Sequence, residues 1–367
     1  MHRRDTRVAV MMSGGVDSSV AAALLIQKGF DVIGMTMHLW DYATTGRIPE
    51  GKRGCCDISD QHDARVVCDQ LRIPHVVLDL RKQFLQDVVQ PFEQSYLAGE
   101  TPNPCVNCNS KIKWGSLLGK ARALECDFVA TGHYAKVVRG KRGLRLEKSV
   151  DPVKDQSYAL WEISRATLAR TLLPLGGWTK AKIRQKAAEL GLRTAVKSES
   201  QDVCFIPDHY RQHLIKTLNG RLNCLQAGKI VDPAGKVLGT HDGYFGFTIG
   251  QRRGLNIGDG SGPYFVLKIV PSTNTVVVGR SEELRSYRCE VRSVNWLSFD
   301  PPQSPQPCVV KIRYSDPGTR AMIHPEVDGK VVIEFRSSVR AITPGQSAVW
   351  YRGKVVWGGG IIHRGVA

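Results

Sequence analysis

The stretch Ser13-Gly14-Gly15-Val16-Asp17-Ser18-Ser19 decides the fold of the first domain, because it joins a short apolar run to a helix-forming segment. The apolar residues Val8 to Met12 precede it, and an Ala- and Leu-rich segment from Val20 to Ile26 follows it. This order is typical of a strand, a tight turn and the start of a helix. Glycines let the main chain approach an anion, and the N–H groups of a helix start attract phosphate. The stretch therefore predicts a phosphate-binding turn.

No lysine closes this turn, so it differs from a Walker loop, which requires G-x-x-x-x-G-K-[ST]. Its spacing S-G-G-x-D-S-S resembles the pyrophosphate-binding loop of ATP pyrophosphatases, which cleave ATP to AMP and pyrophosphate while they activate a carbonyl oxygen. A glycine turn before an ordinary core helix is the alternative interpretation.

The first half of the chain alternates predicted strands with predicted helices, which indicates an open parallel sheet covered by helices. Ligands of such sheets bind beyond the carboxyl ends of the strands. The glycine turn and the segment Thr131-Gly132-His133-Tyr134 both follow predicted strands. We also expect Thr179 to cap a helix over 180–190, which Gly191 ends. The other predicted strands and helices are 8–12, 32–38, 75–79 and 128–130, and 18–28, 61–71 and 111–124, respectively.

From about Gly228 the pattern changes to short alternating apolar runs separated by Gly and Pro. Strands are predicted at 309–314, 331–335 and 349–357, the last folded over a turn at Gly353-Lys354. We therefore predict three domains: an α/β catalytic domain over 1–205, a small β-rich central domain over 206–280 and a C-terminal β-barrel over 281–367.

Charge and composition favour a cytoplasmic protein that binds nucleic acid. The formal net charge is +17, and such an excess is usually explained by attraction to phosphate backbones. The sequence has no apolar run of about 18 residues and no secretory region at its start, so we expect no membrane partner. Ten cysteines in a cytoplasmic protein indicate catalysis or metal binding rather than a disulfide framework.

The segment Thr101-Pro102-Asn103-Pro104-Cys105-Val106-Asn107-Cys108-Asn109 contains the first pair of candidate reactive cysteines. Its prolines predict a rigid loop that presents the cysteines. We expect Asn109 to cap the following helix, which would leave Cys108 near a positive helix end with Lys111 and Lys113 nearby. That setting favours the thiolate. A zinc half-site or two inert cysteines are the alternatives.

Cys204 follows a polar run, Ser198 to Asp202, that predicts a loop. A single cysteine is more often a core residue than a functional one. Together with an ATP-cleaving loop and Cys108, however, Cys204 suggests sulfur transfer. One thiol can carry sulfur as a persulfide, and a second can release it by disulfide exchange.

These segments resemble those of the tRNA-specific 2-thiouridylase family, bacterial enzymes that thiolate the wobble uridine of certain tRNAs. The resemblance implies an adenine nucleotide alpha hydrolase-like first domain and a central domain that binds tRNA. The matching segments run almost from end to end: 13–19, 101–109, Ala130 to Tyr134, Lys154 to Tyr158, Gly250-Gln251-Arg252-Arg253-Gly254-Leu255, Thr343 to Ala348 and Gly358 to Ile362.

The resemblance implies a two-step reaction. The uridine O2 attacks the α-phosphate of ATP, with magnesium offsetting the phosphate charge and Asp17 among the catalytic residues. Cys204 then bears the incoming persulfide, and Cys108 is the catalytic nucleophile, so that a disulfide between them can form. The implied ATP-binding residues are Met11, Met12, Ser13, Gly14, Gly15, Val16, Asp17, Ser18, Met37 and Gly132.

The resemblance also implies the partners. These are the anticodon stem-loop of tRNA and a cysteine desulfurase or sulfur-relay protein. A base that is modified at its own carbonyl must leave the stack. From the residues alone, 154–156 would be a solvated turn and His133 a core histidine. The residues that match target-base and tRNA contacts of the family are Asn103, Pro104, Cys105, His133, Lys154, Asp155, Gln156, Arg313, Tyr314 and Gln346.

Cys105 departs from the family pattern, because many members carry Asp at this position. With Cys108 and Cys204 it resembles a subset in which three cysteines hold a [4Fe-4S] cluster and leave one iron open to hydrosulfide. The cluster and the persulfide relay both remain open at this point. Cys55 and Cys56 receive no role.

Two other classes of protein are possible from the sequence. An ATP-dependent amidating ligase has the same loop, but it needs ammonia, and the sequence suggests no glutaminase triad. A non-catalytic tRNA-binding protein would explain the net charge and the β-barrel. It would give no function to the ATP loop and the paired cysteines.

Overall fold

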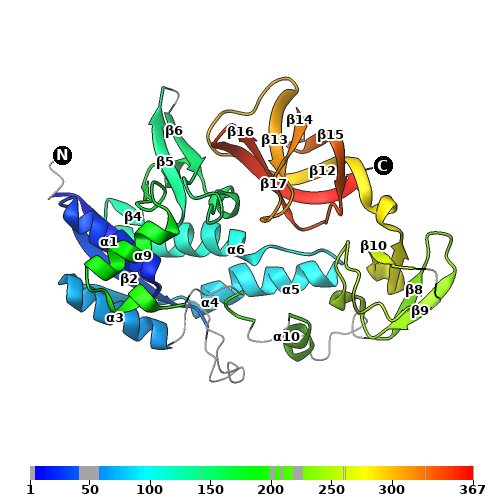
Figure 1. Cartoon of the computed structure of the whole chain (residues 1–367), viewed down its shortest axis with the longest axis horizontal. Helices are drawn as coiled ribbons and strands as arrows, with labels where there is room; N and C mark the ends of the chain where they lie inside the picture. Colours follow the sequence, from blue (N-terminus) through cyan, green and yellow to red (C-terminus); the bar gives the residue numbers. More distant parts are fainter. Residues whose placement is uncertain are drawn as a thin grey trace.

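The computed structural model describes residues 5–40, 58–141, 143–198, 203–206, 210–217, 226–258, 260, 262–326 and 328–366. Within them lie an N-terminal parallel sheet with its helices, a small central sheet and a C-terminal β-barrel (Figure 1). The predicted fold class is thereby confirmed. Cys55, Cys56 and residues 199–202 of the segment before Cys204 lie outside the described residues.

The N-terminal sheet contains parallel strands in the order β3-β2-β1-β4-β7. Successive side chains of β1 enter two different cores, Val8 and Val10 one of them and Ala9 and Met11 the other. Both faces of the strand are buried, which explains its uninterrupted apolar sequence. Strands β1 to β4 were predicted to within one residue, whereas β7 was not predicted. The strands are β1 (Arg7–Met11), β2 (Asp31–His38), β3 (His75–Asp79), β4 (Phe128–Ala130) and β7 (Thr171–Leu172).

Helices cover both faces of this sheet. One face packs against α1 (Val16–Gln27), α3 (Ile58–Leu71) and α9 (Lys180–Glu189). The other packs against two longer helices that each contain a π-helical stretch. The first consists of α4 (Arg81–Phe84), η2 (Leu85–Val89) and α5 (Gln90–Leu97), and the second of α6 (Pro104–Asn107), η3 (Cys108–Leu117) and α7 (Leu118–Ala123).

The helix that contains Cys108 begins earlier than predicted. Asn103 is its N-cap, since the Asn103 side chain accepts a hydrogen bond from the N–H of Cys105 at 3.2 Å. Pro104 occupies the first helical position, where its missing N–H costs nothing. Asn109 therefore does not cap a helix. It is buried inside one, and its Nδ2 donates to the carbonyl of Ala159 at 2.9 Å.

The capping prediction for Thr179 was also wrong in its chemistry. Thr179 occupies the N-cap position of α9, but its side chain makes no capping hydrogen bond. Asp151 accepts from the N–H of Lys180 instead, at 2.9 Å. Gly191 follows the helix with φ of +62°, as the sequence predicts for a residue that ends it.

The central domain is a four-stranded sheet in the order β10-β11-β8-β9, with helix α10 (Tyr210–Thr217) beside it. Ile230 and Val276 of this sheet belong to the same apolar core as Phe92 and Tyr96 of α5, which points toward the central domain (Figure 1). The two domains thus share a core rather than a flexible link. The strands are β8 (Gly228–Val231), β9 (Val237–His241), β10 (Phe265–Val270) and β11 (Thr275–Gly279).

Six strands form the barrel in the order β12-β15-β14-β13-β16-β17, and pairing of β12 with β17 closes it. Val310, Ile333 and Trp350 fill its interior. The turn at Gly353-Lys354 joins β16 to β17, as predicted, whereas β13 ends at Lys311, short of the predicted 314. The strands are β12 (Arg285–Trp296), β13 (Gln306–Lys311), β14 (Thr319–Pro325), β15 (Val331–Arg340), β16 (Ser347–Arg352) and β17 (Val355–Val366).

A hairpin from the first part of the chain extends the barrel sheet. It consists of β5 (Ala135–Gly140) and β6 (Gly143–Lys148), and β6 pairs antiparallel with β17 through Glu147 and Val355. Sequence analysis did not predict this hairpin. No helix in the described part of the chain has the length and apolar character needed to cross a membrane.

Candidate active site

The glycine turn lies at the carboxyl end of β1 and leads directly into α1. Gly14 has φ of +67°, and a Cβ there would lie 2.2 Å from the carbonyl oxygen of Asp60, so only glycine fits. The Ser18 hydroxyl accepts from the N–H of Ser13 at 3.2 Å. Gly15 has no side chain to cap α1, which leaves N–H groups at the helix start able to bind an anion.

Lys197 connects the glycine turn to two carboxylates of α3. Its Nζ donates to the carbonyl of Gly14 at 2.9 Å, to Asp60 at 2.6 Å and to Asp63 at 2.5 Å. The three side chains are largely removed from solvent, with 10%, 6% and 17% of their surfaces exposed. Sequence analysis assigned this lysine no role, because its partners are more than a hundred residues away.

Asp17 forms hydrogen bonds with two neighbouring side chains, Lys180 and Tyr134. Its carboxylate accepts two hydrogen bonds from Lys180 Nζ, at 2.8 and 2.9 Å, and one from the hydroxyl of Tyr134 at 2.7 Å. A Cβ on Gly132 would lie 2.9 Å from the main chain of Asp17, so the segment after β4 packs directly on the turn. A lysine that the loop sequence itself lacks thus lies beside the turn, on α9.

The segment after β4 also contacts the helix that contains Cys108. Lys113 Nζ donates to Asn109 Oδ1 at 2.8 Å and lies 3.5 Å from His133 Nε2. The His133 ring packs on Trp114, with ring centroids 5.5 Å apart. Burial, and secondly the charge of Lys113, hold the pKa of His133 well below its usual value. His133 is therefore neutral and packed. This agrees with the core histidine that the residues alone indicated at this position.

The three candidate cysteines differ in exposure. Cys105 is exposed, and Cys108, one helical turn later, is partly buried, as is Cys204. Cys108, Cys204 and Met37 pack against the same apolar core. Phe205, next to Cys204, contacts the ring of Phe92 at a centroid distance of 5.3 Å, which fixes this part of the chain on α5.

The described residues do not gather these cysteines into a metal site. No three His, Cys, Asp or Glu side chains among them lie close enough together to hold a metal ion. The described residues therefore show no donor set for a [4Fe-4S] cluster.

The barrel holds residues 101–105, which we call the target-base segment because they contain Asn103, Pro104 and Cys105, the residues that the resemblance places around the target base. Gln346 Nε2 donates to the carbonyl of Thr101 at 2.8 Å, and the N–H of Thr101 donates to the carbonyl of Pro344 at 2.9 Å. Arg292 binds both carboxylate oxygens of Glu100, at 2.7 and 2.8 Å. Gln346, predicted to contact tRNA, thus uses its side-chain nitrogen to bind the main chain just before Asn103.

The central domain contacts the same region. Thr101 Oγ1 lies 3.3 Å from Thr248 Oγ1, within hydrogen-bonding distance. Tyr244 donates its hydroxyl hydrogen to the carbonyl of Leu97 at 2.8 Å. Segments of all three parts of the molecule therefore meet around residues 97–103.

The other residues with predicted tRNA contacts come together from distant parts of the sequence. Tyr314 packs on Tyr158 with ring centroids 6.2 Å apart, and burial and the nearby Asp155 raise its pKa. Gln156 Oε1 accepts from the N–H of Tyr134 at 2.9 Å, which connects this group to the glycine turn. Tyr314 thus lies near residues 154–156, and Tyr134 connects Gln156 to Asp17 in the glycine turn.

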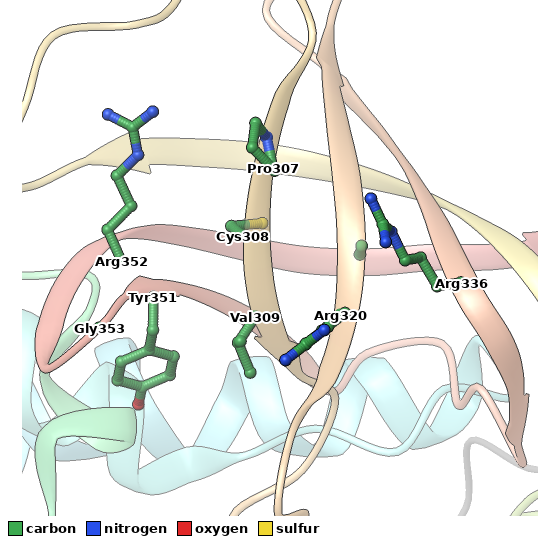
Figure 2. A pocket seen from close by; sticks show the side chains of 9 residues that line it. Pro307, Cys308, Val309, Arg320, Arg336, Tyr351, Arg352 and Gly353 are labelled. Atoms are coloured by element: carbon green, nitrogen blue, oxygen red, sulfur yellow. The ribbon is translucent and has the colours of Figure 1, made fainter.

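A separate basic hollow lies on the barrel (Figure 2). It has a volume of about 350 Å³, and Arg320, Arg336 and Arg352 extend around it. Burial raises the pKa of the Cys308 thiol beside it to about 12, so this cysteine stays protonated. None of the predicted site residues lines the hollow.

A glycine turn at the carboxyl end of a parallel strand, leading directly into a helix, is typical of nucleotide-binding α/β enzymes. Family models agree with this architecture. The tRNA methyl transferase HUP domain matches residues 6–208, the tRNA methyl transferase PRC-barrel domain matches 215–280, and the aminomethyltransferase beta-barrel domain matches 286–362.

Relatives align over nearly the whole chain. The tRNA-specific 2-thiouridylase MnmA of Clostridium botulinum (strain Alaska E43 / Type E3) is 44% identical over 357 residues, which are 97% of this chain and 98% of the relative. The enzyme of the same name from Heliobacterium modesticaldum is 45% identical over 362 residues, 97% of this chain and 92% of the relative. The chain belongs to the tRNA-specific 2-thiouridylase family.

Solved structures resemble the chain more weakly. A 4-thiouridine synthetase in complex with RNA and ATP is 16% identical and superposes with a TM-score of 0.34, covering 57% of this chain and 50% of that chain. A likeness of this size carries no functional argument.

Proposed function

We propose that this enzyme catalyses the ATP-dependent 2-thiolation of the wobble uridine of tRNA. Membership of the 2-thiouridylase family supports tRNA thiolation. One observation supports the chemistry most directly. The adjacent residues His133 and Tyr134 contact, respectively, Lys113 on the Cys108 helix and Asp17 in the glycine turn. A nucleotide bound at the turn would thus lie close to the helix that carries a candidate nucleophile.

The first step of the proposal is adenylation of the base. The uridine O2 attacks the α-phosphorus of ATP, and pyrophosphate leaves with the electron pair of the broken P–O bond. The N–H groups of the turn bind the phosphates, while Lys180, 2.8 Å from Asp17, adds positive charge beside them. Magnesium would supply further charge neutralisation. Because Asp17 is already bound by Lys180 and Tyr134, we propose that the ion binds mainly through the phosphates.

The second step replaces the activated oxygen with sulfur. The terminal sulfur of a Cys204 persulfide attacks C2 of the uridine, and AMP leaves. The Cys108 thiolate then attacks Sγ of Cys204, which breaks the S–S bond, releases the thiolated base and forms a Cys108–Cys204 disulfide. A reducing thiol resets the enzyme, and a cysteine desulfurase or sulfur-relay protein reloads Cys204. The packing of both cysteines on one core supports this pairing.

The iron–sulfur alternative would use Cys105, Cys108 and Cys204 as ligands. Since the described residues do not gather them into a metal-binding group, no step is assigned to a cluster. The two routes differ at Cys105. We expect Cys105→Ala to retain most of the thiolation activity, whereas loss of activity together with iron and sulfide in anaerobically purified protein would overturn the persulfide route.

The central experiment combines purified enzyme, tRNA, ATP and a persulfide donor. We expect AMP to form only when tRNA is present, and thiouridine to appear in the tRNA by mass spectrometry. Cys108→Ser and Cys204→Ser should abolish thiouridine but retain pyrophosphate release. A requirement for ammonia would indicate an amidating ligase, and tRNA binding without ATP cleavage would indicate a non-catalytic protein.

A further inference from the structure

The segment Gly250-Gln251-Arg252-Arg253-Gly254 forms an exposed turn in the central domain and has no part in the chemistry above. Arg252 and Arg253 are both exposed at its tip. A hollow of about 450 Å³ opens beside it, lined in part by Arg252 and Tyr264. Exposed arginines on a basic protein are often only solvated. A binding role for this pair is therefore argued from the rigidity of the turn and from its position.

Hydrogen bonds on both sides make the turn rigid. Gln251 Oε1 accepts from the N–H of Thr248 at 3.0 Å, and its Nε2 donates to the carbonyl of Arg253 at 2.9 Å. The main chain of Val266 pairs with both Gly250 and Gln251, at 2.8 and 3.0 Å. The glycines at the two ends have φ of +84° and +76°, which other residues rarely adopt. The turn thus presents its arginines from a fixed main chain.

The turn also lies next to the target-base segment. Thr248, whose N–H is bound by Gln251, has its hydroxyl 3.3 Å from that of Thr101. On the other side, a Cβ on Gly250 would lie 2.8 Å from Cβ of Ala341 in the barrel, so the turn is packed against both neighbouring parts of the molecule. Two hydrogen-bonded residues therefore connect the arginine pair to the segment that precedes Asn103.

We propose that Arg252 and Arg253 bind backbone phosphates of the tRNA strand next to the target uridine. The inference rests on the proposed function, because it deepens how that substrate is held. A base that is extruded from an anticodon loop leaves its flanking phosphates exposed. The guanidinium fork matches a phosphate in two hydrogen bonds, and a fixed main chain reduces the entropy lost on binding. The arginine pair thereby fixes the strand while the base enters the site.

The test is the double variant Arg252→Gln/Arg253→Gln. We expect the KM for tRNA to rise roughly tenfold, with kcat at saturating tRNA and the KM for ATP nearly unchanged. Loss of two phosphate contacts to a single strand should also reduce the slope of log Kd against log salt concentration by about 1.4. Arg252→Lys/Arg253→Lys keeps the positive charges but lacks the two-pronged guanidinium groups. Its KM for tRNA should therefore fall between those of the wild type and of the glutamine variant.

The matched control is Lys120→Gln/Arg122→Gln, which removes two exposed positive charges from α7, just before the amino end of β4. If the control raises the KM for tRNA as much, or if the turn variant leaves both KM and salt slope unchanged, the inference is overturned. If the double glutamine variant has a lower Tm, the double lysine variant is compared with the wild type for its KM for tRNA instead. A wild-type enzyme that does not thiolate tRNA would contradict the proposed function, whereas an active wild type with an unaffected turn variant would contradict only this contact.

Discussion

The side-chain amide of Gln346 donates a hydrogen bond to the main-chain carbonyl of Thr101, 2.8 Å away, although 245 residues separate them in sequence. Together with the paired contacts of Arg292 and Glu100, this bond fixes the target-base segment to the barrel. The barrel is therefore part of the candidate active site and not an appended binding module.

We expect Gln346→Ala to lower kcat/KM for tRNA about fivefold, because a net hydrogen bond is worth about 1 kcal/mol. The KM for ATP should not change, since the glycine turn lies elsewhere. Steady-state kinetics with tRNA as the varied substrate measure the effect. Gln306→Ala, which removes a surface bond to Arg352 of the barrel, is the control. Equal kinetics in both variants would show that the Thr101 contact has no catalytic consequence.

Lys197→Met should destabilise the protein by roughly 3–5 kcal/mol, because it leaves buried Asp60 without its counter-charge and Asp63 with only the more exposed Arg193. It should also raise the KM for ATP, since Gly14 loses its support. Thermal unfolding and pyrophosphate release measure the two effects. Adding Asp60→Asn and Asp63→Asn should recover stability but not the ATP KM. Recovery of both would mean that the lysine acts on the fold alone.

Asp17→Asn and Lys180→Met should each slow tRNA-dependent AMP formation, because the two groups form one ion pair beside the turn. In the double variant the losses should not add, and the coupling free energy should be about 1–3 kcal/mol. Tyr134→Phe removes the third hydrogen bond to the carboxylate and should have a smaller effect. Strictly additive losses would mean that the two side chains act independently.

His133 should make stability depend on pH. Its pKa is well below 6.5 in the folded protein and about 6.5 when unfolded, so the unfolded state binds the additional proton first as the solution is acidified. The free energy of unfolding should therefore fall below about pH 6.5, by up to about 1.4 kcal/mol per pH unit for this group. His133→Gln should reduce that slope in Tm measurements between pH 7.5 and 5, whereas replacement of the exposed His363 should not. Partly buried His75 and buried His241, whose pKa values burial also lowers, should add to this dependence.

Local sequence was sufficient for strands β1 to β4 of the first sheet and for the glycine turn, but not for the short edge strand β7. The strand before the turn is buried on both faces, so its continuous apolar run had one simple interpretation. Gly14 and Gly191 were informative because their positive φ values restrict those positions to glycine. The helix start at Pro104 was missed because two prolines were taken to indicate a loop. Proline at the first helical position is in fact favourable.

The partners of the site residues could not be predicted in the same way. Lys197 and Lys180 reach the turn from 183 and 163 residues away, and no local pattern encodes which carboxylate a lysine meets. The resemblance selected Gln346 and His133 but not what they touch. Their contacts follow from how the barrel and the sheet pack, which depends on the whole chain.

The pairing of β6 with β17 has a consequence for dividing the molecule into fragments. A fragment that ends at residue 280 would keep β5 and β6 but lose the strand that covers the open edge of β6. Exposed strand edges recruit other strands. Such a fragment should self-associate even though its parallel sheet and central domain are intact, and a barrel produced alone would expose the complementary edge of β17.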